Sequence, residues 1–122
     1  MSAVLGLVLP GLPHPLLHPE GNASWSEIRT GFEAVRQQLI DAGVKRLVLY
    51  STQWFSILGH QVQAHRNPTW THVDQEFHHL GSIPYSFQID TAFADKIVEH
   101  AQKRGLHART TDYHGFPIDT GS

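Results

Sequence analysis

Two runs rich in hydrophobic residues lie in the first fifty positions, separated by a stretch with helical spacing. Residues 3–9 form a continuous apolar run, typical of a strand buried on both faces of a sheet, and residues 44–50, which are apolar apart from Lys45 and Arg46, predict a second buried strand. Between them, apolar side chains recur at helical spacing after a capping-box sequence, S-W-S-E, that starts at Ser24. Gly43 stands where a helix ends in a left-handed residue. Strand, helix and strand in this order predict a right-handed βαβ unit.

The pattern changes in the middle of the chain. No periodicity is visible over residues 51–84, which predicts a long functional loop with a short helix. Alternating apolar and polar positions at 85–89 predict a strand, and residues 106–111 predict another. The two strands are separated by a segment with helical spacing.

That segment predicts a second helix, capped by Asp90 or Thr91 and ended by Gly105. Its inward-facing positions are expected to be Phe93, Ala94, Ile97, Val98 and Ala101. Alternation of strands and helices predicts an α/β fold in which residues 1–122 form one domain, with helices flanking a mostly parallel or mixed sheet. No element follows the last strand to cover it, so the domain is expected to be truncated.

The amino-acid composition excludes several classes of function. The 122 residues include no cysteine, which excludes thiol chemistry and iron–sulfur clusters, and the net charge is −2 with histidine neutral. Scattered basic residues argue against nucleic-acid binding, and no apolar run approaches the roughly 20 residues that span a bilayer. The protein is therefore expected in the cytoplasm. The ten histidines make metal or acid–base chemistry worth testing.

Candidate ligands follow the predicted parallel strands, where α/β folds place their sites. These loops carry His14, His18, Gln53, Asp112, His114, Asp119 and Thr120. A mononuclear iron site needs two imidazoles and a carboxylate on one face, and His14 and His114 can converge in such an arrangement. The alternative is that both are loop histidines without a ligand role. Aromatic residues after the second run, Tyr50, Trp54 and Phe55, are predicted to form pocket wall or core.

A histidine-rich segment, residues 72–79, offers a second metal hypothesis. On a strand, His72, Asp74 and Glu76 would share a face, whereas on a helix His72, Glu76 and His79 would. The segment matches no established ligand motif. The alternative is a solvated or interface loop.

Three motifs together resemble a known family. They are PGLPHP at residues 10–15, YSTQW at 50–54 and IDTGS at 118–122, and they resemble, in order and spacing, the class III extradiol dioxygenases. That family opens catechol-like rings with non-haem Fe(II). The resemblance covers the whole chain but less than half of a typical family subunit, and it implies the N-terminal portion of an extradiol dioxygenase-like fold.

The chain departs from the family at each functional histidine of these motifs. The resemblance puts Gly11 and Gln53 at the two iron-binding histidines and Thr120 at a substrate-contacting histidine, while the carboxylate ligand belongs to the family's C-terminal half. Glycine has no ligand atom, and a glutamine carbonyl binds Fe(II) far less well than imidazole. The resemblance therefore implies no catalytic residue and no metal in this chain. His14 is the alternative ligand, and His14, Trp54 and Asp119 are the substrate-pocket candidates.

This pattern resembles the non-catalytic α-subunit lineage of the family's aminophenol-cleaving members. There, an inactive subunit pairs with a metal-bearing catalytic subunit in a hetero-oligomer. The resemblance implies a structural or regulatory subunit acting on aminophenol- or catechol-type aromatics, with Fe(II) in the partner and residues 60–79 as a candidate interface. Two alternatives stay open: an active Fe(II)-dependent ring-cleavage dioxygenase, and a diverged α/β binding protein with no ring-cleavage role.

Overall fold

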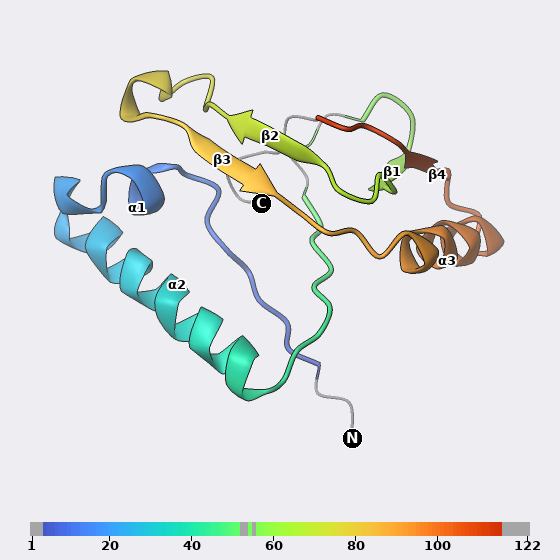
Figure 1. Ribbon diagram of the computed structural model, residues 1–122, viewed down its shortest axis with the longest axis horizontal. Helices are drawn as coiled ribbons and strands as arrows, with labels where there is room; N and C mark the ends of the chain where they lie inside the picture. The colour runs from blue at the N-terminus through green and yellow to red at the C-terminus, as the bar shows by residue number, and fades with distance from the viewer. Residues whose placement is uncertain (1–3, 52–53, 55, 116–122) are drawn as a thin grey trace. The chain divides into compact units, whose positions relative to one another are not determined.

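The computed structural model describes residues 4–51, 54 and 56–115, whose helices and strands are labelled in Figure 1. The chain divides into two compact units. Among the described residues, the first unit holds 4–51 and 73–82, and the second holds 54, 56–72 and 83–115. Each unit combines segments that are distant in the sequence, so each depends on contacts that local sequence patterns do not reveal.

The first unit is helical. Its elements are α1 (His14–Leu17), the 3₁₀ turn η1 (Pro19–Gly21), the long helix α2 (Ala23–Asp41) and a second 3₁₀ turn, η2 (His78–Leu80). Helices α1 and α2 and the turn η1 pack against one another. The prolines on either side of the first residue of α1 are fully buried, so the packed centre of this unit lies at the start of α1.

Helix α2 begins two residues earlier than predicted, because its cap is Asn22 and not Ser24. The Asn22 side-chain oxygen accepts a hydrogen bond from the backbone N–H of Trp25 at 3.0 Å, and Ser24 lies inside the helix. The predicted capping box is therefore wrong: asparagine is as good a cap as serine and has the extended backbone that the position requires. At the other end, Gly43 has φ +63°, which confirms the predicted left-handed residue.

These two candidate caps can be separated by mutation. Asn22→Ala is expected to lower the free energy of unfolding of the first unit by about 1 kcal/mol, because it removes the cap's acceptor. Ser24→Ala is expected to leave stability unchanged within about 0.5 kcal/mol, since its side chain caps nothing. Urea unfolding followed by the backbone amide signals of α2 measures both. A larger loss for Ser24→Ala would contradict this cap assignment.

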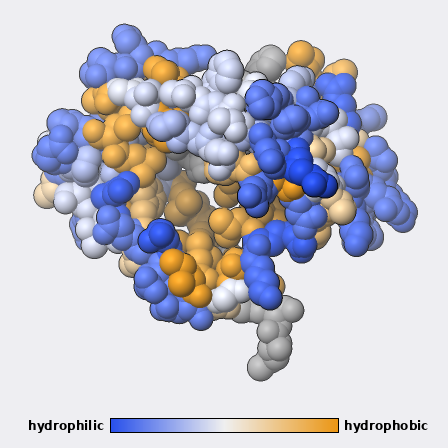
Figure 2. Space-filling view, in the orientation of Figure 1, coloured by the Kyte–Doolittle hydropathy of each residue, from blue (hydrophilic) through white to orange (hydrophobic). Residues whose placement is uncertain are grey.

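The two long apolar runs do not form the predicted strands. Residues 4–9 and 44–50 have no regular secondary structure, so the predicted βαβ unit is absent. Their side chains are exposed, reaching 99% for Val8 and 76% for Tyr50, and hydrophobic atoms are visible at the surface in Figure 2. Continuous hydrophobicity indicates only that a segment favours burial. A strand also needs a neighbouring strand that pairs with its backbone through hydrogen bonds. The sequence of the segment itself does not show whether such a neighbour exists.

The second unit contains two sheets of two strands each. Strands β1 (His60–Gln63) and β4 (Ala108–Thr111) are parallel, with His60 opposite Ala108. Strands β2 (Thr69–His72) and β3 (Ile83–Ser86) are antiparallel, with Trp70 opposite Tyr85. The prediction of a long loop with a short helix over 51–84 was therefore wrong, because β1, β2 and the start of β3 lie in this segment. The strand predicted at 85–89 is observed at 83–86, and the one predicted at 106–111 is confirmed over its last four residues.

Helix α3 (Thr91–Lys103) packs against β1 and β4 and supplies the core of this unit. The predicted cap is confirmed for Asp90, whose carboxylate accepts a hydrogen bond from the N–H of Phe93 at 3.0 Å. Ala94 and Val98, both predicted to face inward, are only 3% and 9% exposed. The predicted α/β class, with a mixed pattern of strand pairing and helices, is confirmed. Among the described residues, no helix is long and apolar enough to cross a membrane.

Candidate functional site

Some of the residues singled out from the sequence are described by the structure and others are not. Gly11, His14 and Trp54 are described and half-buried. Gln53, Asp119 and Thr120 lie outside the described residues, as does Phe55. His14 belongs to the first unit and His114 to the second, so their convergence on one ion stays a prediction.

His14 packs as part of an aromatic cluster in the first unit. Its ring centroid lies 4.3 Å from that of Trp25 and 4.5 Å from that of Phe77, the latter in a T-shaped arrangement. Pro13 and Pro15, on either side of it, are fully buried. The Nδ1 atom of His14 is buried, and none of the described residues provides it with a hydrogen-bond partner. These contacts favour a packing role for the imidazole.

His18, the second histidine of this loop, forms a local surface pair. Its Nδ1 lies 2.7 Å from the Oε1 of Glu20. A hydrogen bond with its own backbone, and then the one with His18, lower the pKa of Glu20. The His18 side chain is 43% exposed and that of Glu20 72%. This pair stabilises the turn η1, and among the described residues no third ligand is grouped with it.

The histidine-rich segment adopts neither arrangement that would align its ligands. Only His72 lies in a strand, and the Asp74 carboxylate folds back to accept hydrogen bonds from the N–H groups of Glu76 and Phe77 at 3.0 and 2.9 Å. This turn is neither of the two arrangements in which the ligands would align, so neither shared face forms. Within the described part of the chain, no three histidine, aspartate or glutamate side chains are grouped to hold a metal ion.

A different set of polar side chains meets where the parallel strands β1 and β4 end. The Nδ1 of His65 lies 2.5 Å from the Oδ1 of Asp112, and the Nε2 of His65 lies 3.2 Å from the Nδ1 of His114. The two imidazole rings are nearly perpendicular. We call these three residues the strand-end cluster. It occupies the edge at which α/β folds place their sites, as the sequence predicted for Asp112 and His114.

Gln63, the last residue of β1, holds the ends of β1 and β4 together at this edge of the sheet. Its side-chain N–H donates to the carbonyl of Tyr113 at 2.9 Å, and its side-chain oxygen accepts from the backbone N–H groups of Ala64, His65 and Tyr113 at 3.1 to 3.3 Å. One amide thus ties the ends of both strands together. Sequence analysis missed Gln63 and His65 because both lie in the segment predicted as a loop, and only their pairing with β4 reveals them.

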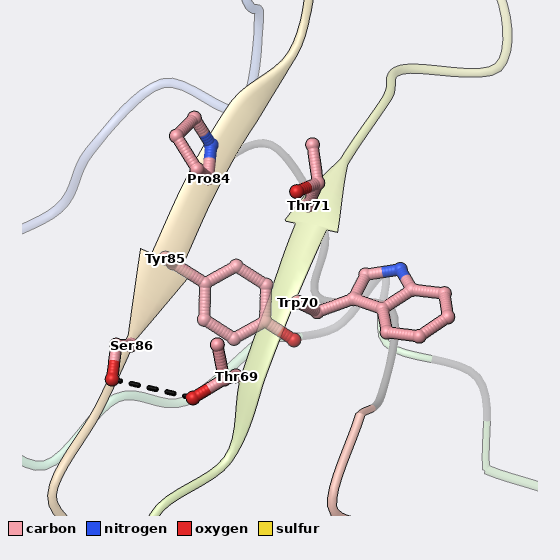
Figure 3. A pocket seen from close by; sticks show the side chains of 6 residues that line it. All are labelled: Thr69, Trp70, Thr71, Pro84, Tyr85 and Ser86. Carbon is pink, nitrogen blue, oxygen red and sulfur yellow. Dashed lines mark hydrogen bonds between the residues drawn. The ribbon is translucent and has the colours of Figure 1, made fainter.

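A shallow hollow of about 660 Å³ lies on the β2–β3 hairpin (Figure 3). Trp70 and Tyr85 line it from opposite strands, and the Thr69 hydroxyl donates to the hydroxyl of Ser86 at 3.3 Å. Trp70 is 51% exposed, and no charged residue is among the six that line the hollow. Such a surface can contact a flat apolar group, and no histidine, carboxylate or lysine is among its six lining residues.

Comparison with known proteins identifies relatives that match the whole chain. No family model matches. The 2-aminophenol 1,6-dioxygenase alpha subunit of a Pseudomonas species is 33% identical over 122 residues, covering all of this chain and 45% of the relative. The beta subunit of the same enzyme is 23% identical over 126 residues, covering 98% of this chain and 41% of the relative.

The chain spans less than half the length of these curated relatives. The similarity nevertheless runs through all three motifs of the resemblance, from residues 10–15 to 118–122, because the match to the alpha subunit covers the entire chain. These similarities are consistent with a class III extradiol dioxygenase-like protein, and this chain matches part of such a subunit.

Proposed function

We propose that the chain serves as a non-catalytic subunit, or part of one, in a dioxygenase that cleaves aminophenol- or catechol-type rings. The observation that carries the proposal is the residue types at the family's ligand positions, Gly11 and Gln53. Higher identity to the alpha subunit than to the beta subunit, 33% against 23%, supports the same lineage.

The donor atoms do not fit an iron site of the family's type. Gly11 has no side chain, and a glutamine carbonyl is a much weaker Fe(II) ligand than imidazole. With Gly11 and Gln53 in place of the two histidine ligands, two nitrogen ligands and a carboxylate cannot be assembled from these positions. Fe(II) and the chemistry of oxygen activation are therefore assigned to a metal-bearing catalytic subunit, and this chain contributes no catalytic step.

The partner in this proposal is a catalytic-type dioxygenase subunit within a cytoplasmic hetero-oligomer. Exposed apolar side chains at residues 47–50 offer a surface suited to burial against another chain. In the second unit, the hollow with Trp70 and Tyr85 has the aromatic character that is enriched at interface centres. Residues 60–79 remain the candidate interface segment on the same grounds.

Oxygen uptake tests the proposal. With 2-aminophenol or catechol as substrate and Fe(II) present, the chain alone is expected to consume no oxygen, because it lacks the ligands that bind iron and activate oxygen. Addition of a metal-bearing catalytic subunit is expected to produce uptake and a co-eluting complex. Uptake by the chain alone, abolished by His14→Phe, would contradict the proposal and favour the active enzyme.

An anaerobic Fe(II) titration provides a second measurement. The Gly11→His/Gln53→His double variant restores both imidazoles and is expected to bind Fe(II) more tightly than the natural chain. The matched control is Gly31→His/Gln38→His, which adds two imidazoles on exposed positions of α2 that are two helical turns apart. Equal binding by the two double variants would show that residues 11 and 53 do not stand at the positions of the family's iron-binding histidines.

A further inference from the structure

We propose that the strand-end cluster binds a divalent transition-metal ion such as Zn²⁺, with the Nε2 of His65 and the Nδ1 of His114 as its protein ligands. These two nitrogens are 3.2 Å apart. Zinc–imidazole bonds are about 2.0–2.1 Å long, so two nitrogens on one ion are about 2.9–3.4 Å apart. The separation therefore lies within the range of two nitrogens that share one ion.

Asp112 prepares the His65 ring for this role. Its carboxylate accepts a hydrogen bond from the His65 Nδ1 at 2.5 Å, which places the ring proton on Nδ1 and leaves the lone pair of Nε2 directed toward His114. A carboxylate behind a ligating histidine is the usual outer-shell arrangement in metal sites, where it fixes the tautomer and raises the basicity of the ligand. Asp112 therefore acts as a positioning residue.

The two ligands are held by backbone as well as side-chain bonds. The N–H of His65 donates to the Gln63 side chain, and the carbonyl of His114 accepts from the N–H of Thr69 at 2.9 Å. Without an ion, the Nδ1–H of His114 can donate to the Nε2 of His65. Binding needs only that this proton move to the Nε2 of His114, so both imidazoles remain neutral.

Imidazole ligands suit zinc, copper, iron and nickel. The His65 side chain is 30% exposed, so positions on the ion that face solvent are left to water, as in an open site. The pair involves neither Gly11, Gln53 nor Thr120. It is therefore independent of the proposed subunit role, and failure of either proposal leaves the other intact.

Zinc titration followed by long-range ¹H–¹⁵N spectra of the imidazoles tests the inference on the whole chain. Before zinc is added, His65 is expected to carry its proton on Nδ1. One equivalent of Zn²⁺ is expected to shift the Nε2 of His65 and the Nδ1 of His114 ahead of all other histidine nitrogens. Shifts confined to other histidines, or a His65 proton on Nε2, would overturn the proposal.

Variants make the assignment quantitative. His114→Ala and His114→Gln are each expected to abolish the binding of the first equivalent, and Asp112→Asn is expected to weaken it about 10–100-fold. His100→Ala, which removes an exposed imidazole from α3, is the matched control and is expected to bind as the natural chain does. Backbone amide spectra check that each variant is folded. Unchanged zinc affinity in folded His114 variants would refute the site.

Discussion

Replacing Gly59 with alanine is expected to lower the free energy of unfolding of the second unit by about 2–4 kcal/mol. Gly59 has φ +72°, a conformation that costs a residue with a side chain about 1–2 kcal/mol. An added Cβ would also lie 2.2 Å from the carbonyl oxygen of His107. That carbonyl accepts the N–H of His60 at 2.7 Å, so relieving the overlap weakens the first hydrogen bond between β1 and β4, worth about 0.5–1.5 kcal/mol.

Gly105→Ala is the matched control for this effect. Gly105 lies in the same unit and has φ +80°, but an added Cβ would meet nothing within 4 Å. The control is expected to lose only the conformational cost of about 1–2 kcal/mol. Urea unfolding of the two variants, with amide exchange of His60 as a local probe, measures the difference. Equal losses would show that the backbones at Gly59 and His107 are not in contact.

Elements that are defined by local chemistry could be predicted from the sequence. Helix α3 has an apolar stripe, an aspartate cap at Asp90 and a glycine after its end, and each of these signals acts within one helical turn. Helix α2 was predicted for the same reason, and only the identity of its cap differed, because Asn22 and Ser24 are both good capping residues two positions apart.

Strands were predicted poorly because their partners are distant. Strand β1 has the sequence His60-Gln-Val-Gln63, which lacks the apolar character expected of a buried strand, and it forms by pairing with β4 nearly fifty residues later. The prediction for residues 44–50 was wrong in the opposite way. This segment has the composition of a strand, but no strand forms there. The hydrophobic pattern indicates only that a segment tends to be buried. Whether it becomes a strand depends on a second segment that pairs with it.

In the candidate site, too, residues with a local signal were predicted and one that depends on distant strand pairing was missed. Asp112 and His114 were predicted because they follow a strand, and the rule that sites lie at strand ends is local. His65 was missed because its place opposite them depends on the register of β1 with β4. The interpretation of Gly11, Gln53 and Thr120 rests on the resemblance to a family, since nothing in the physical chemistry of a glycine or a threonine indicates that a histidine is expected there.

His14→Ala is expected to lower the free energy of unfolding of the first unit by about 1–3 kcal/mol. Alanine removes ring contacts with Trp25 and Phe77, each worth about 0.5–1.5 kcal/mol beyond simple burial. His14→Phe keeps an aromatic ring there and removes the buried Nδ1 for which the described residues supply no partner. Because an unpaired buried polar atom costs about 1–3 kcal/mol, phenylalanine is expected to match or exceed histidine in stability.

The control for this pair is His18→Ala, whose ring centroid lies 6.1 Å from that of Trp25 and whose side chain is 43% exposed. It is expected to lower stability by less than about 1 kcal/mol, the most that an exposed ion pair contributes. Thermal unfolding with and without Fe(II) then separates the two interpretations of His14. If the imidazole only packs, Fe(II) leaves the natural chain and His14→Phe equally stable; if it is a ligand, Fe(II) stabilises the natural chain and has no effect on His14→Phe. The second result would mean that the proline-rich loop presents His14, three residues beyond Gly11, as the family's first iron ligand, and that the chain keeps part of the catalytic site.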